Sequence, residues 1–218
     1  SRKLSGSMNV PYIADIEHLA ADSLRQKLAS EGTAFAVGCN NWAADYPYTP
    51  TVMAYLAYSK SSLALLFSVE ESHTKAVEME DNGRVWEDSC VEFFVKNPAG
   101  EGYYNFELNA IGTLLAAYRT SRECADHFTA EQLAQIARYT SFDHAPIDIC
   151  GDNRWWAAEL IPFSILGLSA APAKLAVNLY KCGDKLAQPH FLSWSPITLD
   201  KPNFHCPEFF GEITFCNE

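Results

Sequence analysis

Carboxylate and amide side chains alternate with apolar ones along two segments that a short turn connects. The segment 103–109 reads Tyr-Tyr-Asn-Phe-Glu-Leu-Asn, and the segment 90–96 reads Cys-Val-Glu-Phe-Phe-Val-Lys. Successive side chains of a strand point to opposite faces, and the Pro/Gly turn at 98–102 predicts an antiparallel pair. One face is then apolar, and the other carries the polar side chains Glu92, Asn105, Glu107 and Asn109.

Trp86 precedes the first of these strands and would place an indole ring beside the polar face. A sugar uses both features, because its C–H face packs on an aromatic ring while its hydroxyls pair with carboxylates and amides. Such hydrogen bonds contribute roughly 1.5–3 kcal/mol when one partner is charged. A polar strand face can also be the solvated side of a sheet, although Asn is depleted in strands. The pattern is compatible with both interpretations, and the sugar-binding one can be tested.

Two further interpretations remain open for the same residues. A glycoside hydrolase needs two carboxyl groups about 5–5.5 Å apart for retention or about 6.5–9.5 Å apart for inversion. Glu92 and Glu107 form the natural pair, because opposed side chains of adjacent strands lie about 5 Å apart. The other interpretation is a sandwich domain that mediates protein contacts without binding a ligand.

The composition excludes several classes of partner. The formal net charge is −11, which disfavours nucleic acid and anionic membrane surfaces, since both attract clustered Lys and Arg. No stretch of about 18 apolar residues predicts a membrane span. The seven cysteines show no C-x-x-C spacing, so we expect free thiols in a reducing compartment, with no metal and no cofactor.

Short apolar or alternating runs dominate the chain and predict strands. They lie at 33–37, 52–59, 62–69, 90–96, 103–109, 113–118, 155–161, 175–181 and 209–216. Helices are predicted only at 22–30 and after Thr129, where Gln132 completes a capping-box pattern. The expected fold is an all-β antiparallel sandwich, jelly-roll or immunoglobulin-like, with two short peripheral helices. The segment 119–153 is interpreted as an insertion.

One domain is expected over residues 8–218, because all-β domains reach roughly 250 residues. Residues 1–7 are interpreted as an expression scar that precedes Met8. If Met8 is the native start, a cytoplasmic location is expected. If an export signal has been removed, the protein is expected to be exported.

Several segments resemble, in order, the family 9 carbohydrate-binding modules of the wider DOMON-like sandwich group. The likeness extends from about residue 33 to 216 and includes a W-x-x-D-x-V-E-like signature. It is carried by the segments 63–70, 86–94, 104–109, 156–163, 193–196 and 207–213. The resemblance implies non-catalytic sugar binding in service of polysaccharide or glycoside breakdown, with a mono- or oligosaccharide as the ligand.

The resemblance also assigns roles to residues. It implies that Trp86 and Phe204 sandwich the sugar ring, that Glu92 and Asn109 hold its hydroxyls, and that Tyr180 lies near another polar contact. His205, next to Phe204, is then expected to line the pocket. Two positions depart from the family pattern, because Glu107 stands in place of an Arg and Phe204 in place of a Trp.

Other DOMON-like domains bind haem, which leaves a redox module as an alternative. Haem iron commonly takes Met or His as axial ligand, and Met53, Met79 and His190 are available. The spacing of these residues indicates no particular pair.

Overall fold

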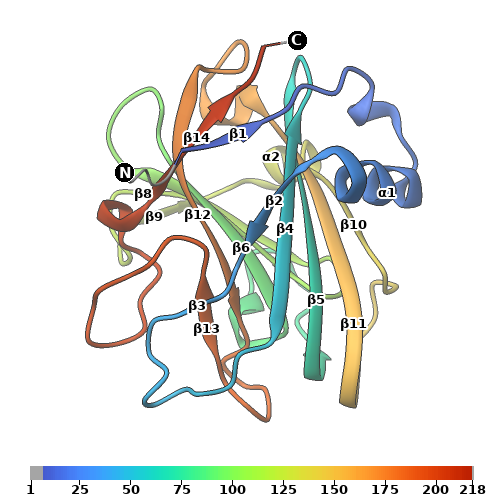
Figure 1. The fold of residues 1–218 in the computed structure, drawn as a ribbon, viewed down its shortest axis with the longest axis vertical. Coiled ribbons are helices and arrows are strands. Elements are labelled where there is room, and N and C mark those ends of the chain that lie inside the picture. Colours follow the sequence, from blue (N-terminus) through green and yellow to red (C-terminus); the bar gives the residue numbers. More distant parts are fainter. Residues whose placement is uncertain (1–6, 218) are drawn as a thin grey trace.

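Two β-sheets face each other across a shared apolar core in the computed structural model, which describes residues 7–217 (Figure 1). In Figure 1, β4, β5 and β11 of one sheet pass in front of β6 of the other, and α1 lies at one side. The predicted all-β sandwich with two short helices is confirmed.

The first sheet has five antiparallel strands in the order β10-β11-β5-β4-β2. Their bounds are Ala137–Thr140 (β10), Ile147–Pro162 (β11), Ser62–Ala76 (β5), Thr51–Tyr58 (β4) and Thr33–Ala36 (β2). Helix α1 (Ala21–Glu31) packs on its outer face through Leu24 and Leu28.

The second sheet has nine strands in the order β1-β14-β12-β6-β7-β8-β9, with β13 beside β12 and β3 beside β13. Only the pair β1–β14 is parallel among the described strands. The bounds are Ser7–Val10 (β1), Gly211–Phe215 (β14), Lys174–Cys182 (β12), Cys90–Lys96 (β6), Tyr103–Asn109 (β7), Leu114–Arg119 (β8), Ala125–His127 (β9), Phe191–Ser193 (β13) and Cys39–Asn40 (β3).

The sequence located seven strands to within two residues and gave no signal for five short ones, β1, β3, β9, β10 and β13. Strands β6 and β7 have the predicted bounds, whereas β5 and β11 continue beyond the apolar runs into a polar ribbon. The supposed insertion 119–153 contributes edge strands β9 and β10 and helix α2 (Ala130–Ala134), where Thr129 and Gln132 form the expected capping box. Of the expected expression scar 1–7, residues 1–6 lie outside the described residues, and Ser7 begins β1.

Strict alternation along β6 and β7 divides the second sheet into two faces. The side chains of Val91, Phe93, Val95, Phe106 and Leu108 enter the core between the sheets. The predicted apolar face is therefore confirmed, and the opposite face carries the polar residues of both strands.

A buried ion pair joins the two sheets across the core. Lys181 of β12 and Glu71 of β5 are almost fully buried, with Lys181 Nζ 2.9 Å from Glu71 Oε1. Lys181 Nζ also donates to His190 Nε2 at 2.7 Å, and Trp155 Nε1 donates to Glu71 Oε2 at 2.6 Å. Burial opposes ionisation of Glu71, but the Lys181 ammonium together with the hydrogen bonds from Trp155 and Ser89 outweighs it, and the pKa of this carboxyl is lowered.

A second buried carboxyl has no such partner. Glu159 of β11 is 1% exposed, and neither of its oxygens accepts a hydrogen bond from a described residue. Its cross-strand neighbour Arg138 pairs with Asp81 instead, at 2.7 and 2.8 Å. Burial raises the pKa of Glu159 to about 8, an effect that the Arg138 charge only partly offsets.

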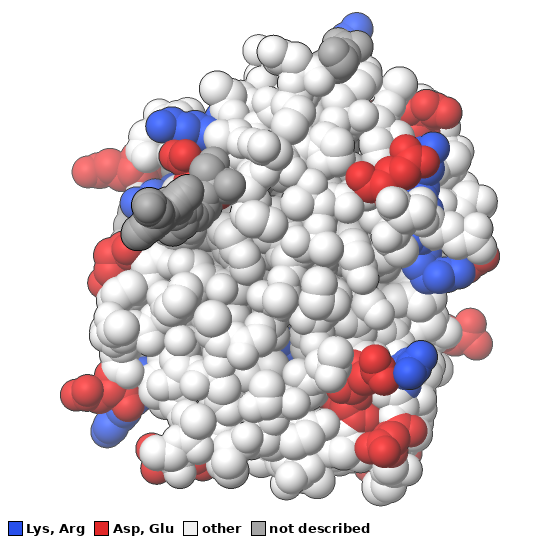
Figure 2. Space-filling view, viewed as in Figure 1, with Lys and Arg blue, Asp and Glu red and all other residues white. Residues whose placement is uncertain are grey.

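Charged side chains lie mainly at the margins of the face shown in Figure 2, and the middle of that face carries few. All seven cysteines are free thiols, as expected. Within residues 7–217, no helix combines the length and apolar composition that crossing a bilayer requires.

Replacing Lys181 with Met should lower the free energy of unfolding by about 3–5 kcal/mol, because it leaves the Glu71 charge buried and unpaired. The double variant Lys181→Met/Glu71→Gln should recover most of this loss, since a Gln oxygen still accepts from Trp155. Urea unfolding of both variants measures the difference. Equal stability of the single and double variants would contradict this account.

The free energy of unfolding should fall as the pH rises from the usual pKa of a glutamate through about 8. The reason is that the folded state holds the Glu159 proton more tightly than the unfolded state does. The contribution of Glu159 is up to about 1.4 kcal/mol per pH unit over that range. Comparing the unfolding free energies of the wild type and Glu159→Gln between pH 5 and 9 isolates it. Parallel pH profiles for the two proteins would refute the assignment.

Candidate functional site

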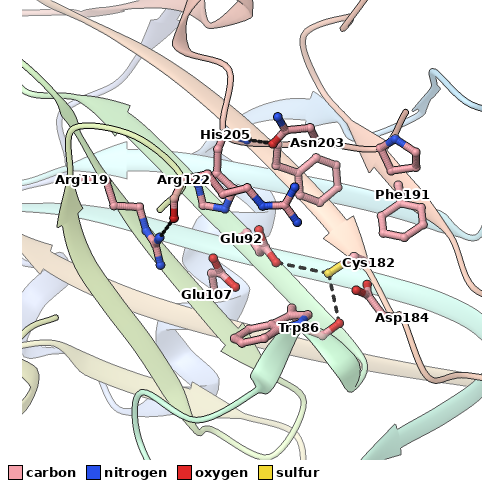
Figure 3. Close-up of a pocket in the computed structure, with 12 residues that line it drawn as sticks. Trp86, Glu92, Glu107, Arg119, Arg122, Cys182, Asp184, Phe191, Asn203 and His205 are labelled. Carbon is pink, nitrogen blue, oxygen red and sulfur yellow. Dashed lines mark hydrogen bonds between the residues drawn. The ribbon is translucent and has the colours of Figure 1, made fainter. Parts of the chain in front are cut away.

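The candidate site lies on the outer face of the second sheet, where strands β6, β7, β8 and β12 form its floor. The segment 183–210, which follows β12, covers part of this face and leaves a pocket of about 260 Å³. That volume is near the lower end of the range for small-molecule sites, about 300–1,000 Å³. In Figure 3, Glu92 and Glu107 lie between Trp86 on one side and His205 and Asn203 on the other.

Trp86 lies in a short 3-10 helix, Val85–Glu87, immediately before β6. Its neighbour Val85 is fully buried and anchors this turn in the aromatic cluster under the pocket. The Trp86 carbonyl accepts a hydrogen bond from Asp184 N at 3.2 Å. The half-buried indole is thereby held at the pocket wall rather than in the core between the sheets.

Phe204 reaches the pocket from the C-terminal segment and is 8% exposed. One face of its ring stacks on Tyr180 of β12, with 4.0 Å between ring centroids and 7° between ring planes. The Tyr180 hydroxyl donates to the Phe204 carbonyl at 2.9 Å. Tyr180 is fully buried and does not line the pocket. Its role is to support Phe204 from behind.

Glu92 and Glu107 form a directly opposed cross-strand pair on the pocket floor. Both are nearly inaccessible, and their carboxyl groups hydrogen-bond to each other. Burial raises the pKa of Glu107 to about 7 and that of Glu92 well above its usual value, to which the neighbouring acids add. The pair therefore retains a proton near neutral pH and offers both a donor and acceptors.

Two thiols contact the buried end of Glu92. Cys182 Sγ lies 3.2 Å from Glu92 Oε2, and Cys90 Sγ lies 3.7 Å from the same oxygen (Figure 3 shows the contact of Cys182). The hydrogen bond with Cys90, together with burial, raises the pKa of Cys182 well above its usual value. Both thiols are therefore protonated at neutral pH in the absence of a cation.

Arginine side chains form one flank of the pocket. Arg119, the last residue of β8, donates through Nε to Asn105 Oδ1 at 2.9 Å, and Asn105 Nδ2 donates to Glu107 Oε2 at 2.8 Å. Arg119 Nη1 donates to the Arg122 carbonyl at 2.6 Å. This chain of contacts orients Glu107 and brings positive charge toward the carboxyl pair.

His205 lies across the pocket from Trp86, next to Arg122, and is a neutral imidazole (Figure 3). Its Nδ1 lies 2.8 Å from the Tyr103 hydroxyl, and its backbone N–H donates to Asn203 Oδ1 at 2.9 Å. Burial, together with the positive charges of Arg119 and Arg122, lowers the pKa of His205 to about 3.

Asn109 shares the polar face of β7 but lies outside the pocket, contrary to the expected sugar contact. Its Nδ2 donates to Glu78 O and to Asp88 Oδ2, both at 3.0 Å. Its Oδ1 accepts from Ile111 N at 3.2 Å and from Thr113 N at 2.9 Å. Four bonds use the full capacity of an Asn side chain, so Asn109 fixes the turn after β7 and the loop that leads to Trp86.

The pocket brings together most of the residues that the sequence indicated and adds others. Trp86, Glu92, Glu107, Phe204 and His205 line it, while Tyr180 and Asn109 support it from behind. Sequence reasoning missed Arg119, Arg122, Cys182, Asp184, Phe191, Pro202 and Asn203. Extending the predicted strand 113–118 by one residue would have placed Arg119 on the polar face, and extending 175–181 by one would have done the same for Cys182. The residues contributed by loops have no comparable signal.

The residues considered for haem ligation do not converge. His190 is bonded at both ring nitrogens, to Lys181 Nζ at 2.7 Å and to the Gln188 carbonyl at 2.9 Å. Met79 is 37% exposed, and Met53 lies on β4 of the other sheet. The arrangement therefore does not support the haem alternative.

Taken together, the pocket offers three apolar aromatic side chains, two carboxyl groups that share a hydrogen bond, two arginines and a neutral imidazole. Hydroxyl groups donate and accept simultaneously, so this mixture suits a polyhydroxylated ligand better than a purely anionic or purely cationic one.

Comparison with known proteins agrees with this chemistry. Residues 22–215 match the sequence profile described as carbohydrate-binding family 9. No curated protein sequence matches the chain. A crystal structure of a candidate carbohydrate-binding protein from Bacteroides uniformis superposes with a TM-score of 0.90 at 36% identity, covering 97% of this chain and 100% of that one.

Two structures of a family 9 carbohydrate-binding module from Caldicellulosiruptor kristjanssonii share the fold at 12% identity. The complex with cellotriose has a TM-score of 0.60 and covers 97% of this chain and 94% of that one. The complex with glucose has a TM-score of 0.57, with 97% and 96% covered. With the profile match over residues 22–215, the pocket and the sandwich that carries it identify this chain as a member of carbohydrate-binding family 9.

Proposed function

We propose that this pocket binds one sugar ring between Trp86 and Phe204 without cleaving it. The observation that carries the proposal is the convergence of both aromatic side chains with the Glu92–Glu107 pair in a single pocket. The ring faces supply apolar contact, and the carboxyl pair supplies hydrogen bonds to hydroxyls. Asn109 and Tyr180 act as supports for the turn before β6 and for Phe204.

The dimensions and charge of the pocket favour a neutral ring of the size of one monosaccharide unit. Two carboxyl groups on the floor and Asp184 at the rim repel an acidic sugar, while Arg119 and Arg122 on one flank offer donors to hydroxyls. Because the family 9 modules from Caldicellulosiruptor kristjanssonii bind glucose and cellotriose, β-linked glucose oligomers and glucose are the first ligands to test. Such binding would serve an enzyme that degrades polysaccharides or glycosides.

The carboxyl pair favours binding over hydrolysis. Glu92 and Glu107 hydrogen-bond to each other, which brings their oxygens closer than the about 5–5.5 Å that a retaining glycosidase uses. A shared proton also leaves neither group free as an independent acid and nucleophile.

Trp86→Ala should weaken binding of the best ligand in a glucose, cellobiose and cellotriose panel by at least about tenfold, equivalent to about 1.4 kcal/mol. The loss follows from removal of the ring that stacks on the sugar. Isothermal titration calorimetry measures it. The matched control is Trp156→Ala, which removes a half-buried indole from the outer face of the other sheet.

Equal weakening by Trp156→Ala would mean that the effect is not local to the pocket. If the wild-type protein gives no heat and no shift in melting temperature with neutral sugars and with glucuronate, the proposal is wrong.

Glu92→Gln should reduce affinity by about tenfold or more, because it replaces a carboxyl hydrogen bond of roughly 1.5–3 kcal/mol with an amide one. The measurement is made in EDTA so that no cation contributes. Glu101→Gln, in the exposed turn between β6 and β7, is the control and should bind as the wild type does. An unchanged affinity in Glu92→Gln would remove the carboxyl pair from the proposed contact set.

A further inference from the structure

Two cysteines face each other across adjacent strands at the floor of the pocket. The antiparallel register of β6 and β12 places Cys90 directly opposite Cys182. Glu92 lies two residues beyond Cys90 and therefore on the same face of the sheet. One ligand atom from each of the three side chains lies within 4.8 Å of the other two.

The separations match the edges of a zinc tetrahedron. With Zn–S near 2.3 Å and Zn–O near 2.0 Å, tetrahedral geometry requires about 3.5 Å between a sulfur and an oxygen and about 3.8 Å between two sulfurs. The observed distances to Glu92 Oε2 are 3.2 Å from Cys182 Sγ and 3.7 Å from Cys90 Sγ. A small cation would fit among these atoms with side-chain shifts of a few tenths of an ångström.

The cluster is closed on the protein side and open on the pocket side. Cys90 is fully buried beneath the sheet surface, whereas Cys182 and Glu92 line the pocket. Zinc sites with three protein ligands keep a water molecule or a substrate at the fourth position, in contrast to structural sites, which are closed. A water molecule or a hydroxyl group in the pocket could occupy that position.

The charges around the cluster also favour a cation. Two carboxyl groups and two thiols adjoin one another. Arg119 and Arg122 flank the same pocket, but within residues 7–217 no Lys or Arg nitrogen lies within ion-pair distance of Glu92 or Glu107. Lys181, between the strand neighbours Tyr180 and Cys182, points to the opposite face and pairs with Glu71. A divalent ion would compensate the buried acids by displacing their protons.

A second group of possible metal ligands lies elsewhere in the molecule and is less suited to bind a cation. His73, Asp148 and Cys150 also lie close together, at the exposed end of the polar ribbon. Both ring nitrogens of His73 are already bonded, Nε2 to Asp148 at 2.7 Å and Nδ1 to the Ala187 N–H at 2.9 Å. That group therefore lacks a free imidazole lone pair.

We propose that Cys90, Cys182 and Glu92 bind a thiophilic divalent cation of the zinc class, with its fourth coordination position open to the pocket. The site does not depend on sugar binding, although it shares Glu92 with the proposed sugar contacts. Cation uptake converts two thiols to thiolates and releases their protons to solvent. The proton that Glu92 holds passes to Glu107 or to solvent, and no oxidation state changes.

The test uses the full chain, reduced and stripped with a chelator. Titration with Co²⁺ should give one bound ion per chain with a thiolate-to-cobalt charge-transfer band and the intense visible bands of a tetrahedral site. Zn²⁺ should displace the bound Co²⁺ without further proton release, whereas Zn²⁺ added directly to the stripped protein in a weakly buffered solution should release about two to three protons per ion. Absence of the charge-transfer band in the folded wild type would overturn the proposal.

Single substitutions locate the site. Cys182→Ser should weaken Zn²⁺ binding by at least about 100-fold, as measured by competition with a chromogenic chelator, since loss of a ligand should exceed the 10–100-fold cost of losing a supporting contact. Cys206→Ser is the matched control, because Cys206 is a buried free thiol of the same aromatic cluster but lies outside the group of ligands. Similar weakening in both variants would overturn the assignment.

Sugar titrations with and without EDTA separate this proposal from the proposed function. Sugar binding without stoichiometric Co²⁺ uptake refutes the cation site alone. Co²⁺ uptake with the expected spectrum, without sugar binding, refutes the sugar proposal alone. If mild peroxide treatment of the stripped protein forms a Cys90–Cys182 disulfide and the reduced protein takes up no cation, the pair is a redox pair and the cation site is refuted.

Discussion

The antiparallel register of β6 with β7 and β12 is the constraint on which the rest of the structure depends. It sends Val91, Phe93 and Leu108 into the core and places Glu92 opposite Glu107 and Cys90 opposite Cys182 on the other face. Because side chains alternate with period two, a slip of one residue would exchange the two faces. The same hydrogen-bond ladder therefore specifies both the core and the floor of the pocket.

A polar sheet face becomes a binding site only when something covers it. Here the segment 183–210 folds over β12. Phe204 of this segment stacks on Tyr180 of β12, with 4.0 Å between the ring centroids, and this contact holds the segment in place. On the other side, Asn109 uses all four of its hydrogen bonds to hold the loops before and after it. Tyr180 and Asn109, two of the five residues to which the family resemblance assigned a place at the ligand, thus shape the pocket from outside it.

The buried acids show where stability and function diverge. Lys181 compensates Glu71 inside the core, whereas Glu92 and Glu107 have only uncharged hydrogen-bond donors around them and carry raised pKa values. Uncompensated buried carboxyls oppose folding as they ionise, and such strain is common at sites that bind a partner. A sugar hydroxyl or a cation at this floor would supply the interactions that the protein itself does not. Glu159 is different, since it lies in the core away from the pocket, and no described residue donates a hydrogen bond to its carboxyl group.

The sequence by itself determined the alternation of polar and apolar residues. That alternation predicted the two faces of β6 and β7, the two-sheet class of the fold, and three residues of the pocket, Trp86, Glu92 and Glu107. It could do so because strand periodicity and a short turn are local properties that need no knowledge of the rest of the chain. Phe204 and His205 were found through family resemblance. Only the tertiary structure decided that Asn109 faces a turn, that Cys182 meets Cys90, and that Arg119, Asp184, Phe191 and Asn203 enter the site. These placements depend on contacts between segments far apart in sequence, where loop packing and strand order, rather than periodicity, select the neighbours.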